Sequence, residues 1–80
     1  MIITEKKVRI TKLEKIYENH VSSFEVGGSI EGLLIEPLKT GESVILIVDG
    51  KERIITDKVD AIIDKNHFNS AYSKFKIEYL

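Results

Sequence analysis

The stretch GESVILIVDGKERIIT, residues 41 to 56, carries the strongest structural signal in the chain. Branched apolar residues fill it from Val44 to Val48, which is typical of a β-strand. The pair Asp49-Gly50 follows, and it favours a type I′ turn because both central residues of that turn need a positive φ. Residues Arg53 to Thr56 are then predicted to form the returning strand. We therefore expect a β-hairpin here.

A second strand is predicted at the end of the chain, over residues 72–79. Its apolar side chains, Phe75, Ile77 and Tyr79, alternate with charged ones, so that one face is apolar and the other polar. This pattern indicates a half-buried strand.

Upstream of the hairpin, residues 30–36 are predicted to form another strand. Gly32 within it indicates a bulge or a tight bend, and Pro37 ends it because proline lacks the amide that a sheet ladder needs. Gly27-Gly28 predicts a turn before it. The opening segment is ambiguous. Val8 and Ile10 alternate as in a strand, whereas a helical spacing is shown by Leu13, Ile16, Tyr17 and His20. We expect a strand through Lys12 and a short turn of helix after it.

Four or five short strands with tight turns and no alternation of strand and helix predict an all-β, mainly antiparallel fold. A small barrel of the SH3 or OB kind fits this pattern, and the SH3-like barrel fits the length of 80 residues better. No linker or repeat divides the chain, so residues 1–80 are expected to form a single domain.

Three motifs add a family resemblance: residues 31–42, residues 55–62 and the segment Asn69-Ser70-Ala71-Tyr72. In this order they resemble a set of short uncharacterised bacterial and phage proteins with small SH3-like β-barrels. The resemblance spans about residues 30–80, and Asp57 stands where the pattern has a serine. It implies the barrel fold and no catalytic residue.

The composition and the apolar runs of the chain indicate the cellular compartment of the protein. The chain has no cysteine, which excludes disulfides and thiolate metal ligands and fits a reducing cytoplasm. The longest apolar run, Val44 to Val48, is far shorter than the roughly 20 residues of a spanning helix. Lys6 and Lys7 follow only a very short apolar stretch, the reverse of a secretory signal. We expect a cytoplasmic protein that does not enter a membrane.

The sequence contains no pattern for catalysis, a metal or a cofactor. Its only imidazole bases are His20 and His67, and no serine lies in a nucleophile motif. Two distant histidines without cysteine do not form a metal-binding pattern. Asp57, Asp60 and Asp64 are predicted to lie on a solvated face. The protein is therefore not expected to be an enzyme.

Protein binding is the favoured function. Four aromatic residues lie in or beside predicted loops, where a barrel displays its recognition surface. They are Tyr17, Phe24, Phe68 and Tyr72. The alternative is that each closes an end of the core. We expect a non-catalytic binding module, an accessory or inhibitory protein of phage or plasmid type that binds a host protein.

The two alternative functions are binding of single-stranded nucleic acid and sequestration of a small ligand. Residues 1–16 carry a net charge of +3 from five basic and two acidic residues, which is a feature of single-stranded nucleic-acid binding. Residues 17–50 carry −5, however, and the pI is about 6.1, which disfavours it. The other function is sequestration of a nucleotide-like ligand between protomers, with Lys51, Arg53 and His67 as phosphate contacts.

Self-association is the last expectation. Val44 to Val48 leave neither face of their strand polar, whereas a strand of a lone small barrel normally has one wet face. Either a second copy covers the outer face, as a two-fold homodimer, or the segment around Leu13, Ile16 and Tyr17 folds back over it.

Overall fold

The computed structural model of the chain describes residues 4–16 and 25–80. These residues form one antiparallel sheet in the order β4-β3-β2-β1-β7-β6-β5, which confirms the all-β prediction. In the described ranges no helix is long and apolar enough to cross a membrane. The strands are β1 (Thr4–Lys15), β2 (Ser29–Glu36), β3 (Val44–Val48), β4 (Lys51–Thr56), β5 (Val59–Asp64), β6 (His67–Ser70) and β7 (Ser73–Tyr79).

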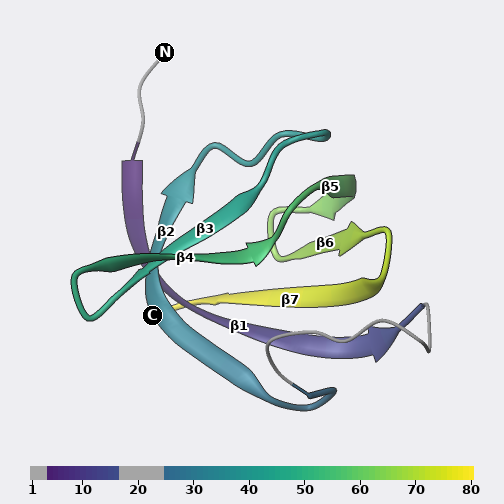
Figure 1. The fold of residues 1–80 in the computed structure, drawn as a ribbon, viewed down its shortest axis with the longest axis horizontal. Coiled ribbons are helices and arrows are strands. Elements are labelled where there is room, and N and C mark those ends of the chain that lie inside the picture. The colour runs from purple at the N-terminus through teal and green to yellow at the C-terminus, as the bar shows by residue number, and fades with distance from the viewer. Residues whose placement is uncertain (1–3, 17–24) are drawn as a thin grey trace.

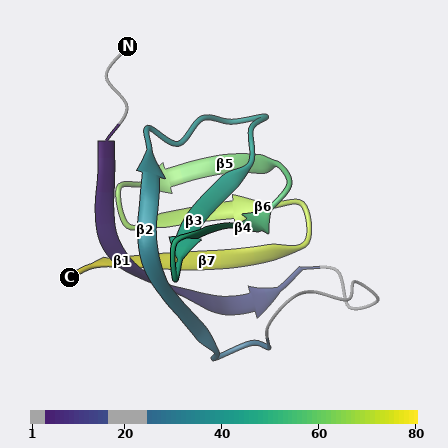
Figure 2. The ribbon, with the colours of Figure 1, turned by 60° about the vertical axis from the view of Figure 1, so that its left-hand side comes forward.

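The sheet curls on itself, with the long strands β1 and β2 bending across it (Figures 1 and 2). Its two edge strands, β4 and β5, are not joined by a ladder, so the barrel is incomplete. Val59 at the start of β5 is hydrogen-bonded to the connection between β2 and β3. Its amide donates to the carbonyl of Glu42 and its carbonyl accepts from the amide of Gly41, each at 2.8 Å. The sheet is therefore open between β4 and β5, and Val59 links β5 to the connection that leads into β3.

The predicted hairpin is confirmed. β3 and β4 pair through the turn at Asp49 and Gly50, whose φ values are 52° and 77°. These are the positive values that a type I′ turn requires. The register shifts between Val44 and Ile45, which leaves Ile55 as an extra residue on β4.

The N-terminal half departs from two predictions. β1 runs to Lys15, so residues 13–15 are strand and not a turn of helix; Tyr17 and His20 lie outside the described residues. The register of β1 with β2 passes through the pair Val8 and Gly32 without a shift, so the bulge predicted at Gly32 is wrong. β2 bends smoothly along its length instead (Figure 2).

All seven strands contribute to the core inside the curled sheet. Phe75 and Ile77 of β7 are buried as their alternation predicts. Phe75 stacks on Phe68 of β6 with ring centroids 5.0 Å apart and planes 16° apart. The buried apolar residues are Val8, Ile10, Leu34, Val44, Leu46, Ile55, Val59, Phe68, Phe75 and Ile77.

Candidate functional site

The end of β1 exposes a group of large apolar side chains, which we call the apolar end. Each of them is between 43% and 49% exposed. They are Leu13, Ile16, Val26 and Tyr72. Soluble domains bury most side chains of this size, so a group of them on one part of the surface points to an interaction site.

Backbone hydrogen bonds hold two turns against the end of β1. The amide of Ile16 donates to the carbonyl of Tyr72 at 2.8 Å, which attaches the turn between β6 and β7. The amide of Gly27 donates to the carbonyl of Lys12 at 2.8 Å, which attaches the turn that carries Val26. Backbone hydrogen bonds thus connect the apolar end to the sheet.

The buried hydroxyl of Ser70 sets the position of Tyr72. Its Oγ accepts hydrogen bonds from the amides of Tyr72 at 3.2 Å and Ser73 at 3.1 Å. A serine hydroxyl that caps nearby amides in this way stabilises a tight turn. The sequence predicts Tyr72 at the start of the last strand, in or beside a loop, and the structure places it in the turn just before β7.

Lys12 lies beneath this end of the sheet and is fully buried. Burial lowers the pKa of its ammonium group, Lys15 lowers it further and Glu25 opposes the shift. In the sequence, Lys12 is one of the five basic residues of the N-terminal segment 1–16. The alternation of Val8, Ile10 and Lys12 was the signal that it points inward.

The predicted aromatic residues are distributed unequally. Tyr72 is exposed at the apolar end, as expected for a recognition residue. Phe68 is fully buried against Phe75, so its predicted place on the recognition surface is wrong: the ring closes the core instead. Tyr17 and Phe24 lie outside the described residues.

His67 is occupied by a local contact. Its Nδ1 lies 3.0 Å from Oδ1 of Asp64 across the turn between β5 and β6. The hydrogen bonds from His67 and from the amide of Asn66 lower the pKa of Asp64. Arg53 is exposed on β4, near the opposite end of the strand order from β6. No contact in the described part of the chain brings Arg53 and His67 together as a phosphate site.

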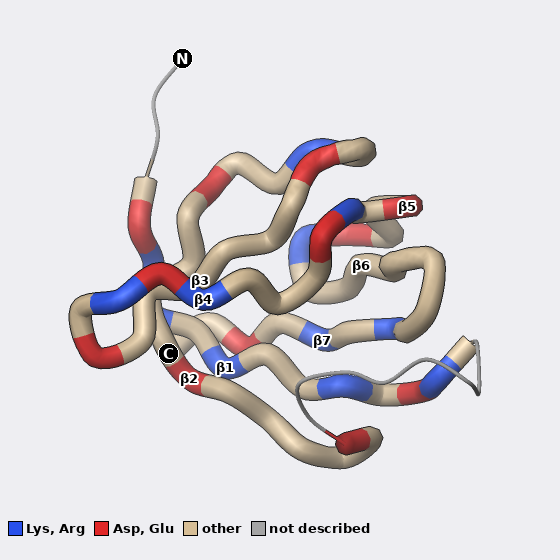
Figure 3. The backbone as a smooth tube through the Cα atoms, in the orientation of Figure 1, with Lys and Arg blue, Asp and Glu red and all other residues tan. Residues whose placement is uncertain are grey.

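The basic N-terminal cluster does not form one continuous face. Arg9 lies 3.3 Å from a carboxylate oxygen of Glu31 and 3.6 Å from one of Glu78. Lys12 is buried, and the ammonium group of Lys6 lies 5.9 Å from the ring centre of Tyr79. Acidic and basic residues lie together on β1, β4 and β7 (Figure 3).

A second apolar surface covers the outer side of β2, β3 and β4, and we call it the outer face. It arises because residues 44–48 are apolar on both sides of their strand: Val44 and Leu46 are buried, while Ile45 and Ile47 are half-buried on the outside. The outer face consists of Leu33, Ile35, Ile45, Ile47 and Ile54. Ile54 is the most exposed of them, at 54%.

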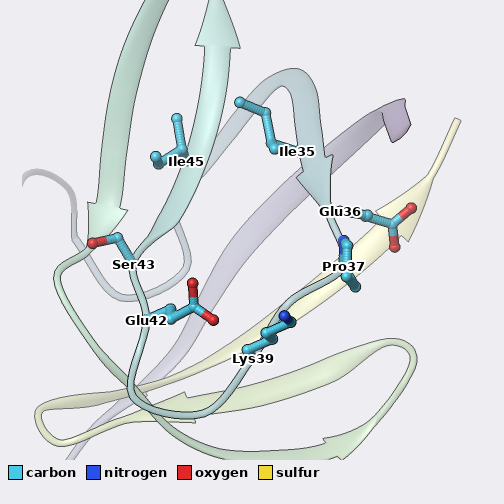
Figure 4. Close-up of a pocket in the computed structure, with 7 residues that line it drawn as sticks. All are labelled: Ile35, Glu36, Pro37, Lys39, Glu42, Ser43 and Ile45. Atoms are coloured by element: carbon cyan, nitrogen blue, oxygen red, sulfur yellow. The ribbon is translucent and has the colours of Figure 1, made fainter. Parts of the chain in front are cut away.

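The outer face ends in a cleft of about 220 Å³. Figure 4 shows Ile35 and Ile45 at one side and Glu42 and Lys39, from the connection between β2 and β3, at the other. Glu36 flanks the cleft, and its carboxylate accepts a hydrogen bond of 3.0 Å from the hydroxyl of Tyr79. Burial and this carboxylate raise the pKa of Tyr79 to about 12.

In the ranges 4–16 and 25–80, no group of histidine and acidic side chains has the arrangement of a metal site. Comparison of the chain with protein-family models, curated proteins and solved structures finds no match.

Proposed function

We propose that the protein is a non-catalytic binding module, of an accessory or inhibitory kind, that recognises a partner protein through its apolar end. The observation that carries the proposal is the exposure of four large apolar side chains on one ordered part of the surface. Their burial against a partner is favourable, at about 25 cal/mol for each Å² of apolar surface removed from water.

The construction of the apolar end favours tight binding. Ser70 and the end of β1 already fix the turn of Tyr72, so little conformational entropy is lost when a partner docks. Tyr72 offers a flat ring together with a hydroxyl, a combination that is enriched at interfaces. An ion pair between Lys74 and Glu14, 3.4 Å apart and solvent-exposed, supplies part of a polar rim.

Other functions receive less support. Arg9 is held by two glutamates and Lys12 is buried, so β1 lacks the basic face that tracks a nucleic-acid backbone. A nucleotide-like ligand needs converging cations, whereas the imidazole of His67 contacts the carboxylate of Asp64 and Arg53 lies on another strand, β4.

Selection of peptides from a random displayed library against the full chain tests the proposal. We expect enriched peptides with apolar anchors, and we expect their amide chemical-shift changes to centre on Ile16, Val26 and Tyr72. Ile16→Ala should weaken binding at least tenfold, a loss of about 1.4 kcal/mol. The matched control is Ile63→Ala, which makes the same truncation at an exposed isoleucine of β5.

Equal affinity of Ile16→Ala and wild type for the selected peptides would count against the apolar end. Shift changes that centre on another surface would do the same. Salt-dependent binding of an oligonucleotide to β1, with no peptide enriched, would favour the nucleic-acid function instead.

A further inference from the structure

One row of side chains crosses the outer face from β1 to β4. The strand registers pair Lys7 with Leu33, Leu33 with Ile47, and Ile47 with Glu52. The row is therefore basic at one end, apolar in the middle and acidic at the other end. Lys7 and Glu52 are both exposed, and neither makes an ion pair with another described residue.

The apolar middle of this row continues into a second row beside it. Ile45 pairs with Ile54, and Ile35 faces the same cleft as Ile45. Five apolar side chains on three neighbouring strands thus lie together. No strand in the described part of the chain packs over them. Leu13 and Ile16, the alternative cover that the sequence offered, lie at the apolar end instead.

We infer that the outer face binds the outer face of a second copy, as a two-fold dimer. A two-fold axis that runs parallel to the strands, midway between β2 and β3, reverses the row in the partner. Lys7 then faces the partner's Glu52, and Leu33 faces the partner's Ile47. Each contact occurs twice in the dimer, as two-fold symmetry requires.

The charge pattern is what selects a second copy as the occupant. When a second copy of the row is turned end to end and placed against the first, the basic end of each copy meets the acidic end of the other. The surface is therefore complementary to itself. The side chains are long enough for this, because packed sheets lie about 10 Å apart and lysine and glutamate reach toward each other across that gap. The axis places no like charges of this row against each other.

The dimer is independent of the proposed partner binding. The apolar end lies at the far end of β1 from Lys7, so each dimer carries two such ends. Two linked sites raise the apparent affinity for a partner that itself has two binding segments.

Charge reversal of the full chain tests the dimer by sedimentation equilibrium across a range of concentrations. We expect wild type to dimerise, and Lys7→Glu or Glu52→Lys alone to raise the dissociation constant about tenfold or more, because each change creates two like-charge contacts. The double variant Lys7→Glu/Glu52→Lys should restore the dimer. Lys58→Glu, an exposed reversal outside the row, is the matched control and should leave the constant unchanged.

A second variant, Leu33→Lys, places a charge in the apolar middle and should give a monomer with unchanged circular dichroism. A wild-type chain that stays monomeric overturns the inference. So does a dimer that the single reversals leave unchanged, or one that the double variant does not restore. Assembly into open-ended oligomers would also overturn it, since that indicates pairing of the sheet edges β4 and β5.

Discussion

The carbonyl oxygen of Ile47 lies 2.7 Å from the position that a β-carbon on Gly32 would occupy. A methyl of Val48 is 3.1 Å from the same point. Glycine is thus required here because the backbone of β3 passes directly against β2. The sequence marked Gly32 as unusual, but it could not distinguish a bulge from a close approach of a strand that lies elsewhere in the chain.

Gly32→Ala should therefore destabilise the fold, because β3 must move to admit the methyl group. Overpacking of this kind costs about 1–3 kcal/mol. Denaturant unfolding measures the effect. Ser29→Ala, an exposed change on the same strand, should shift the free energy of unfolding by no more than about 0.5 kcal/mol. If both variants had the same denaturant midpoint of unfolding, β3 would be able to move away from β2 at little cost in free energy.

Gly50→Val should destabilise the hairpin by about 1 kcal/mol or more, because a β-branched residue resists a positive φ. Gly50 has a φ of 77°. Thermal unfolding reports the loss. The control is Asp49→Asn, since asparagine tolerates the positive φ of that position. A Val variant as stable as wild type would contradict the type I′ assignment.

Phe75→Ala should cost about 3 kcal/mol or more, since it opens a cavity beside Phe68. The two rings are stacked in the centre of the core. A small domain has little stability to spare, so the variant should be largely unfolded near room temperature. Lys76→Ala on the same strand should be nearly neutral. A folded Phe75→Ala variant with wild-type melting behaviour would refute the packing.

Lys12→Met tests the buried amine. The folded state lowers the pKa of Lys12, so between that value and the unfolded value of 10.5 the unfolded chain binds more protons. The stability of wild type relative to Lys12→Met should therefore rise as the pH increases toward 10.5. Denaturant titrations of both proteins at several pH values measure the difference. A difference that stays flat with pH would place the ammonium group in water.

Tyr79 should make the stability of the fold decrease as the pH rises, the opposite of the effect of Lys12. Its folded pKa is raised from 10.0 to about 12, so its contribution is complete below pH 10 and is lost as the pH rises toward 12. Phenolate absorbance in a chain whose other tyrosines are phenylalanine measures the titration directly. Glu36→Gln should lower the midpoint, because it removes the negative charge beside the hydroxyl. An unchanged midpoint in that variant would rule out Glu36 as a cause.

Local signals predicted the elements that are regular. The hairpin followed from Asp49-Gly50, and β7 followed from strict alternation. β5 was missed because the register shifts at Asp60 and Ile63 break the two-residue period that identifies a strand. β6 has only four residues, too few for its alternation to identify a strand, so Phe68 was interpreted as a residue in or beside a loop, although it is fully buried in the core.

The candidate surfaces were only partly predictable. The outer face was visible in the sequence, since five consecutive apolar residues leave no polar side on β3. The apolar end was not, because Leu13, Ile16 and Val26 have the composition of core residues. Their exposure depends on where the turns around β1 lie, and this is set by hydrogen bonds between residues far apart in sequence.

β1 lies between β2 and β7 in the sheet, and Val8 pairs with Tyr79. Because β1 precedes β7 in the sequence, it is translated earlier, and its second edge stays unpaired until β7 has been made. Contacts of such long sequence separation slow folding, typically to milliseconds or seconds. Until β7 has emerged, β1 and the hairpin expose unpaired edges, and in this interval the nascent chain is most vulnerable to aggregation and most in need of a chaperone.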